Sequence, residues 1–220
     1  MQRRPRARAH RAALVSLAIV LVGAAGCTGS TTDGNQQPGT GNAVTNGTDA
    51  SGTPVFPLPK DMAAAIKQAN LPELPDEVLV YHVHAHVDLE INGHRVVIPA
   101  GIGITTDPNV MGPDGRPKRT GISPLHTHDT SGLAHIEAAK EDVFTVGQLF
   151  AEWGVKLDKN CVATYCTDDN NQLLGFLNGE LVGDPASIPL TSHANVYLWF
   201  GKKGTNPKAP TFEFPADLGP

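Results

Sequence analysis

Two short segments of the sequence concentrate histidines at a spacing that predicts metal binding. They cover residues 81–89 and 125–137. Side chains alternate between the two faces of a β-strand, so residues two positions apart share a face. In the first segment this gives one apolar face and one polar face, and the polar face carries His82, His84, His86, Asp88 and Glu90. Because imidazole is the commonest metal ligand in proteins, we expect this strand to contribute to a metal site.

The second segment is interpreted as a hairpin that brings further histidines together. A loop at residues 129–132 would place His126 opposite His135, and opposed Cβ atoms lie about 4.5–5.5 Å apart. His128 would lie one pleat further along the same face. Three imidazoles in this arrangement can hold an ion at about 2.0–2.1 Å and leave its fourth position open. We therefore expect His126, His128 and His135 to form the centre of the site.

A neighbouring strand is expected to complete the site. His82 and His86 would lie about 13 Å apart, so one ion cannot bind all three histidines of the first segment. The predicted ligands are therefore His84, His86, His126, His128 and His135. Three more side chains are expected to support these ligands or to replace one of them, namely His82, Asp129 and Glu137. Asp129 and Glu137 also have simpler interpretations, as a turn residue and as a solvated carboxylate.

Ligand chemistry limits the metals and the functions. Imidazole with carboxylate suits Zn(II), Cu(II), Ni(II) or Fe(II), and the sequence does not choose among them. The first function that fits is an exported module that sequesters or delivers the metal. The second is an enzyme in which the metal activates water for hydrolysis or hydration. The third is a metal-free interaction module, in which the histidines form a hydrogen-bonded polar network.

The first 26 residues are typical of a bacterial lipoprotein signal peptide. Five arginines without any acidic residue precede an apolar run over residues 12–25, which is too short for an ordinary membrane span. The run ends in Ala24-Ala25-Gly26-Cys27, which resembles a lipobox. We expect Cys27 to carry lipid, with palmitate as an acyl group, and to hold the protein at the outer face of the cell membrane. The alternative is an ordinary signal peptide that is cleaved near Ala25, and this also predicts export.

Composition divides the rest of the chain into a tether and one domain. Residues 27–54 are rich in Gly, Ser, Thr and Asn, a composition that predicts a disordered segment. Residues 55–220 have the length of a single globular domain. Removal of the signal peptide leaves 12 of the 17 basic residues against 22 acidic ones, and a net charge near −10 argues against a nucleic-acid partner. The membrane is the partner that the sequence predicts, and no protein partner is indicated.

Two cysteines remain in the expected domain, at Cys161 and Cys166. An exported protein matures in an oxidising compartment, so an even pair of this kind predicts a disulfide. Their use as thiolate metal ligands is the alternative.

Periodicity and turn residues predict an α+β fold. Helices are expected at residues 60–70 and 145–153, the second capped by Thr145 and ended by Gly154. Strands are expected at residues 78–91, 94–102, 124–128, 133–138, 173–177, 180–182 and 196–200. Residues 105–123 are interpreted as a long loop. The expected architecture is a hairpin-rich antiparallel or mixed sheet with one central helix, and its C-terminal half resembles a β-grasp fold in the order of its elements.

Four stretches of the sequence are distinctive: residues 84–93 (HAHVDLEING), 98–104 (IPAGIGI), 125–132 (LHTHDTSG) and 144–150 (FTVGQLF). Together they resemble a family of uncharacterised secreted proteins and lipoproteins of bacteria and archaea. The resemblance covers most of residues 80–200. It implies an exported protein with a single domain, and it implies no activity.

Overall fold

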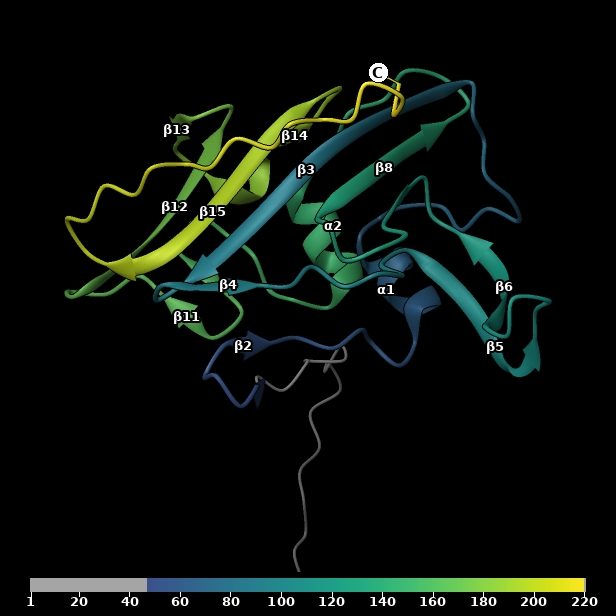
Figure 1. Ribbon diagram of the computed structural model, residues 1–220, viewed down its shortest axis with the longest axis horizontal. Helices are drawn as coiled ribbons and strands as arrows, with labels where there is room; N and C mark the ends of the chain where they lie inside the picture. The colour runs from purple at the N-terminus through teal and green to yellow at the C-terminus, as the bar shows by residue number, and fades with distance from the viewer. Residues whose placement is uncertain (1–46, 220) are drawn as a thin grey trace, which may run out of the picture. The chain divides into compact units, whose positions relative to one another are not determined.

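The computed structural model describes residues 47–219, and a mixed β-sheet forms the centre of this part of the chain (Figure 1). The sheet has seven strands in the order β13-β12-β15-β3-β8-β7, and β4 pairs with the C-terminal part of β3. The strands are β3 (Tyr81–Ile91), β4 (His94–Val96), β7 (Leu125–His126), β8 (Leu133–Ala138), β12 (Asn171–Leu177), β13 (Glu180–Val182) and β15 (Ala194–Lys202). β15 runs parallel to β3, whereas the other pairs of this sheet are antiparallel. The α+β prediction is confirmed at this level, and the β-grasp comparison stays a prediction.

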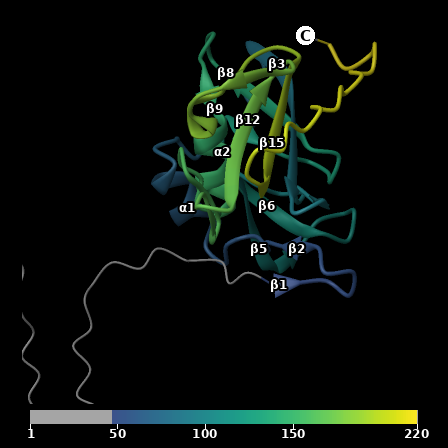
Figure 2. The same cartoon turned by 90° about the vertical axis from the view of Figure 1, so that its left-hand side faces the viewer.

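Two helices lie on one side of the sheet (Figure 2). α1 (Met62–Gln68) begins at Asp61, whose side chain accepts a hydrogen bond from the backbone N–H of Ala64. α2 (Val146–Trp153) begins at Thr145 and ends at Gly154, which adopts a left-handed conformation with φ of 74°. Both ends of α2 are therefore where the sequence predicted them, because a Thr cap and a terminal glycine satisfy the backbone groups that a helix leaves unpaired.

The apolar face of β3 forms the core together with α2. Alternate residues of the strand are buried, namely Val83, Ala85, Val87, Leu89 and Ile91. They belong to the same apolar cluster as Leu149, Phe150 and Trp153 of α2. The indole of Trp153 donates a hydrogen bond of 2.9 Å to the carbonyl oxygen of Phe56, so the one polar atom of this buried ring is satisfied. The predicted alternation of β3 is confirmed.

The polar face of β3 is covered as well. The chain that follows β15 crosses the front of the sheet in Figure 1. There the ring of Phe212 stacks on His86 with centroids 3.9 Å apart. The amide oxygen of Asn195 accepts a hydrogen bond from the backbone N–H of Phe212. Alternation along a strand shows which residues share a face, but it does not show what lies on that face.

Residues 105–123 form a hairpin rather than the predicted loop. β5 (Ile104–Met111) pairs with β6 (Pro117–Ile122), with irregular register between Asp107 and Met111. Proline cannot donate to a β-ladder and is tolerated at the first residue of a strand or at a bulge. Pro117 begins β6 and Pro108 lies in the irregular part of β5, so neither interrupts the pairing. The proline and glycine content led to the wrong interpretation here.

The ordered chain begins before the predicted domain boundary. β1 (Gly47–Thr48) pairs with β2 (Pro54–Val55), so the last eight residues of the predicted tether form a small hairpin. Its turn depends on Asp49, whose carboxylate accepts hydrogen bonds from the backbone N–H groups of Ser51 and Thr53. The predicted signal peptide, Cys27 and residues 28–46 of the tether lie outside the described residues. No helix among residues 47–219 is long and apolar enough to cross a membrane.

The remaining short elements connect these layers. They are β9 (Phe144–Thr145), β10 (Cys161–Val162), β11 (Tyr165–Cys166), a 3₁₀ turn at Pro185–Ser187 and β14 (Pro189–Leu190). β10 and β11 place Cys161 directly opposite Cys166, and the two residues are joined by a disulfide. The structure thus has the disulfide that the sequence predicted for these two cysteines.

The disulfide leads to a prediction for stability. Replacing both cysteines, as in Cys161→Ser/Cys166→Ser, is expected to lower the free energy of unfolding by ~2 kcal/mol, because a crosslink across so short a loop restricts the unfolded chain only modestly. Urea denaturation of the variant and of the wild type measures this difference. A thiol reagent should not label either cysteine in unreduced, denatured wild-type protein. Rapid labelling of both would show that the bond is absent from the mature protein.

Candidate metal centre

Three adjacent strands bring four histidines and one glutamate onto one face of the sheet. β8 lies between β7 and β3. His135 of β8 lies opposite His126 of β7 on one side and opposite His84 of β3 on the other. One pleat along, Glu137 of β8 lies opposite His82. We refer to the resulting set as the histidine cluster, which consists of His82, His84, His126, His128, His135 and Glu137.

Four members of the cluster form a first candidate metal site, which we call group A. His126, His128, His135 and Glu137 each offer one ligand atom, and these four atoms all lie within 4.8 Å of one another. The Nε2 atoms of His126 and His128 are 3.1 Å apart. Oε1 of Glu137 lies 3.8 Å from Nε2 of His126 and 3.7 Å from Nδ1 of His135. Two ligands of a tetrahedral zinc ion at its usual bond lengths are separated by about 3.4 Å, so these distances suit a single ion.

A second candidate site shares one member with the first. His82, His84 and His135 each offer a ligand atom within the same 4.8 Å limit, and we call this set group B. The sequence predicts both His82 and Glu137 as supporting residues or alternative ligands. The structure instead places both among the potential ligands, because the register of β3 against β8 pairs the two residues directly.

Several polar atoms of the cluster are buried without the partner that such atoms normally have. Within residues 47–219, Nε2 of His82, Nδ1 of His135 and Oε2 of Glu137 have no hydrogen-bond partner. Nε2 of His82 is 3.3 Å from Oε1 of Glu137 but is not in hydrogen-bonding geometry with it. Buried polar atoms in native proteins are nearly always paired, and each exception needs an explanation. A cation bound at group A would supply a partner for Nδ1 of His135.

The orientation of His126 favours coordination through a defined nitrogen. Its Nδ1 lies 2.9 Å from the carbonyl oxygen of Ser123, and a carbonyl can only accept, so Nδ1 carries the hydrogen. Nε2 is then the nitrogen with a lone pair, and it faces the other members of group A. Metal-binding histidines commonly donate their second N–H to a backbone carbonyl in this way. Sequence reasoning missed Ser123, because a main-chain acceptor leaves no signature in the residue type.

Burial also sets the charge state of the cluster. It lowers the pKa of His126 to about 3, and it lowers the pKa of His135 to about 4 with a further contribution from the neighbouring histidines. It raises the pKa of Glu137 to about 7, and the negative charge of Glu77 adds to this effect. Both imidazoles are therefore uncharged near neutral pH, and an uncharged ring is the form that can bind a metal.

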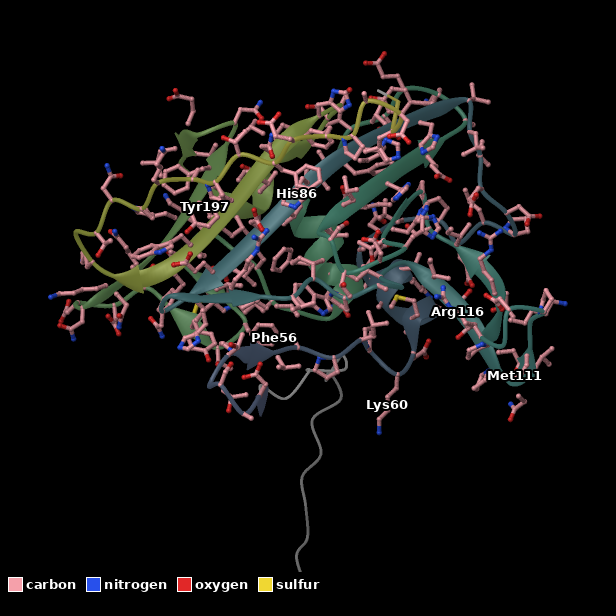
Figure 3. All side chains as sticks on the ribbon, viewed as in Figure 1. Phe56, Lys60, His86, Met111, Arg116 and Tyr197 are labelled. Carbon is pink, nitrogen blue, oxygen red and sulfur yellow. A yellow bond between two sulfur atoms is a disulfide. The ribbon has the colours of Figure 1, made fainter. Side chains whose placement is uncertain are left out.

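His86 does not join the cluster, in contrast to the prediction. Its ring stacks on Phe212, and its Nε2 lies 2.9 Å from the carbonyl oxygen of Ser131. Its partner across β3 and β8 is Leu133, which has no ligand atom. Figure 3 shows His86 on the front of the sheet, on the face that the C-terminal chain crosses. His86 lies on the predicted face of β3, but β8 places a histidine opposite His84 and not opposite His86. Its position on that face alone therefore does not make it a potential ligand.

Asp129 also lies outside both groups. Its carboxylate accepts hydrogen bonds from the backbone N–H and the hydroxyl of Ser131, and it is exposed. These hydrogen bonds lower the pKa of Asp129. The residue therefore has the turn-forming role that was the simpler of its two interpretations.

No family model matches the sequence, and no curated protein or solved structure is similar to it. The resemblance to exported proteins of bacteria and archaea therefore rests on the four sequence stretches alone and stays a prediction.

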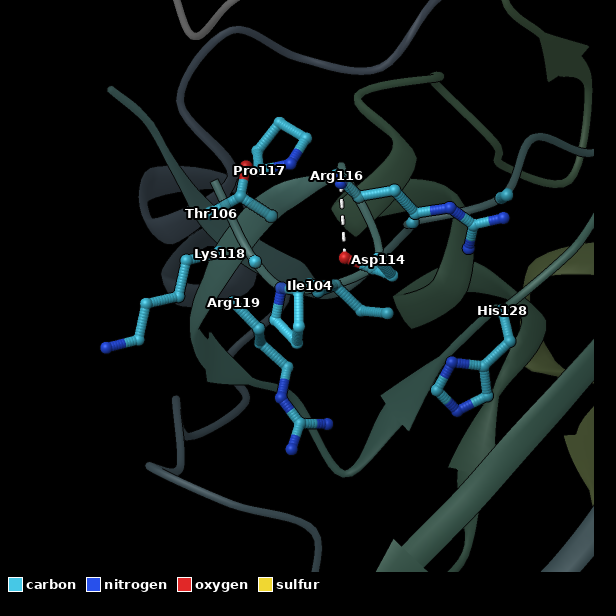
Figure 4. A pocket seen from close by; sticks show the side chains of 12 residues that line it. Ile104, Thr106, Asp114, Arg116, Pro117, Lys118, Arg119 and His128 are labelled. Atoms are coloured by element: carbon cyan, nitrogen blue, oxygen red, sulfur yellow. Dashed lines mark hydrogen bonds between the residues drawn. The ribbon is translucent and has the colours of Figure 1, made fainter. Parts of the chain in front are cut away.

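A pocket of about 820 Å³ borders the cluster at His128. Its wall comes from the β5–β6 hairpin and from the chain before β5. The side chains that line it include three cations, Arg116, Lys118 and Arg119, and one acid, Asp114. Figure 4 shows His128 and Arg119 on either side of the pocket, while the ammonium group of Lys118 points away from it. The exposed His128 thus borders a hollow that Arg116 lines, whereas Arg119 is ion-paired with Asp76 and Glu77.

Glu152 of α2 is a further buried acid that the sequence did not single out as functional. The side chain is fully buried, and within residues 47–219 neither carboxylate oxygen has a hydrogen-bond partner. Burial raises the pKa of Glu152 to about 8. The packing of α2 buries this polar side chain together with the apolar residues of the helix.

Glu152 should make the stability of the protein depend on pH. Its pKa is higher in the folded protein than in the unfolded chain, so between about pH 5 and 8 the folded state holds a proton that the unfolded state has lost. The free energy of unfolding should therefore decrease as pH rises through this window, by at most about 1.4 kcal/mol per pH unit from this residue. In Glu152→Gln this contribution is absent. Urea denaturation at pH 5.5, 7 and 8.5 with a chelator present compares the two slopes, and equal slopes would contradict the assignment.

Proposed function

We propose that the protein binds a divalent transition metal at group A and that it sequesters or delivers this metal outside the cytoplasm. The observation that carries the proposal is the convergence of three imidazoles and one carboxylate within 4.8 Å. Distances of 3.1, 3.7 and 3.8 Å between three pairs of these ligand atoms support it, since one small ion can contact both atoms of each pair. The unpaired buried atoms Nδ1 of His135 and Oε2 of Glu137 support it further.

The ligands of group A differ in exposure, and this difference would allow the metal to enter and leave the site. His126 and Glu137 are buried, and their positions are fixed by β7 and β8. His128 is exposed and follows β7 in the loop toward β8. An ion can therefore reach the site at His128 while the buried ligands hold its geometry. This combination suits a protein that takes up a metal and passes it on.

Metal titration of the full chain tests this proposal. The protein, purified in mild detergent and stripped of metal, would be titrated calorimetrically with Zn(II), Cu(II), Ni(II) and Fe(II) at neutral pH. We expect binding of at least one of these ions, and the order of affinities would identify the class of metal. His94→Ala is the matched control, because His94 lies at the tip of the β3–β4 hairpin, outside both groups. Absence of binding for all four metals would support the polar-network interpretation instead.

The pocket at His128 favours a second candidate function, a metal-dependent enzyme that acts on an anionic substrate. A metal held by the three imidazoles of group A, without Glu137, would have an open position that could activate water, and it would lie beside the hollow that Arg116 lines. Hydrolysis of phosphate and carboxylate esters by the Zn(II)-loaded protein tests this function. Activity should be lost with a chelator and reduced in Arg116→Ala. If the protein binds the metal normally but hydrolyses none of these esters, the enzyme function is wrong and only the binding function remains.

We also propose that Cys27 anchors the protein to the outer face of the cell membrane. The lipobox-like sequence before Cys27 supports this, and so does the resemblance to secreted lipoproteins. Wild-type protein is expected in the membrane fraction, with palmitate incorporated after labelling of cells with the radioactive fatty acid. Cys27→Ala should incorporate none and should be released or remain unprocessed. Unmodified wild-type protein free in the culture medium would contradict the proposal.

A further inference from the structure

We propose that a second divalent ion binds at group B, so that the histidine cluster holds two ions with His135 as a shared ligand. The inference rests on the proposed function, because His135 is also a ligand of the first ion. It assigns a separate role to His82 and His84, which group A does not use. The histidine cluster would then be a two-metal centre rather than a single metal site.

The rings of group B are arranged for convergence. The centroids of His82 and His84 are 4.6 Å apart with an interplanar angle of 58°, and those of His84 and His135 are 4.6 Å apart with an angle of 82°. Rings at such angles can direct nitrogen atoms at a common point, whereas the third pair, His82 and His135, lies at an angle of 25° with centroids 6.0 Å apart. The ligand atoms of the three residues indeed lie within 4.8 Å of one another. Nε2 of His82 is buried and, among residues 47–219, has no hydrogen-bond partner.

The strand order gives His135 its place between the two groups. His82 and His84 lie on β3, His126 lies on β7, and β8 runs between these strands. His135 is opposite His84 on one side and His126 on the other, and it is the residue that both groups contain. An imidazole has two ring nitrogens, so one ring can bind two ions. This ring would then lose its N–H proton to solvent when the second ion binds.

Glu137 also lies between the two halves of the cluster. Its Oε1 is 3.3 Å from Nε2 of His82 and 3.8 Å from Nε2 of His126. Its Oε2 is buried and, in the described part of the chain, unpaired, so the carboxylate has a second oxygen to offer. Two nearby dications repel each other, and a carboxylate together with a deprotonated ring between them reduces this repulsion. The shared His135 and the adjacent Glu137 are therefore of the types that a two-metal centre needs.

Stoichiometry in the full chain distinguishes two sites from one. We expect the wild type to bind two equivalents of Zn(II), measured by equilibrium dialysis and elemental analysis. His84→Gln and His82→Gln should each bind one, and His128→Gln should also bind one because it affects only group A. His82 is half-exposed, so its variant tests the site even if the change at buried His84 disturbs folding. The control His94→Gln should bind two.

The Cu(II) form gives an independent signature of the shared ligand. At two equivalents, two Cu(II) ions bridged by one imidazolate couple magnetically, so the electron paramagnetic resonance signal per copper should fall below that at one equivalent. In His84→Gln, the signal should correspond to one isolated Cu(II) ion.

The outcomes separate this inference from the proposed function. If the wild type binds one equivalent of Zn(II), and His84→Gln and His82→Gln each bind one as well, the second site is wrong and group A is unaffected. Two equivalents in both variants would place the second ion elsewhere and would also overturn the inference. Failure of the wild type to bind any metal would overturn the proposed function as well.

Discussion

Replacing His126 and His128 together with alanine is expected to remove one bound metal ion per chain. The two Nε2 atoms are 3.1 Å apart and form half of the donor set of group A. Loss of a residue that merely orients a ligand weakens metal binding about 10–100-fold, so loss of two ligands should weaken it by more than about 100-fold. Calorimetric titration with the metal that the wild type binds most tightly measures this loss.

The double variant needs a control for folding, because His126 is fully buried. Circular dichroism and the urea midpoint of the metal-free protein should show that the variant remains folded. His128→Ala alone, at the exposed ligand, should already weaken binding in a protein with an undisturbed core. A double variant that bound metal with the affinity and stoichiometry of the wild type would show that group A is not the site.

Saturation with metal is expected to raise the melting temperature of the protein by about 5–10 °C. An ion that binds only the folded state at 100 times its dissociation constant adds about 2.7 kcal/mol to the free energy of unfolding. For a domain of this size, each kcal/mol corresponds to about 2–4 °C. The metal should prefer the folded state, because the pairing of β7 with β8 and of β8 with β3 is what brings the ligands together.

Calorimetric scans with and without metal measure this shift. His135→Ala is the most informative variant, because it removes the residue that both groups contain. Its melting temperature should respond little to metal, whereas that of His94→Ala should rise as in the wild type. An equal rise in His135→Ala would mean that the stabilising ion binds elsewhere on the chain.

The features that depend on local pattern could be predicted from the sequence. The alternation over residues 81–91 gave the buried face of β3, and Asn92-Gly93 gave the register in which Glu90 lies opposite Arg95. The loop at residues 129–132 gave the opposition of His126 and His135. These features follow from the period of a strand and from the geometry of short turns.

The features that depend on neighbours distant in sequence could not be predicted. His86 satisfies the same alternation as His84, yet β8 places Leu133 opposite the first and His135 opposite the second. The pairing of β3 with β8 thus decides that His84 is a potential ligand, whereas His86 stacks on Phe212. Burial of the strand's polar face and of Glu152 likewise arises from tertiary packing, which single-residue patterns do not contain.

Anomalous diffraction from crystals that contain Zn(II), measured at the zinc absorption edge, tests the central claim most directly. The account predicts a peak among Nε2 of His126, Nε2 of His128, Nδ1 of His135 and Oε1 of Glu137, at about 2.0–2.2 Å from each bound atom. Crystals with bound zinc at other positions and no peak at these atoms would contradict the account.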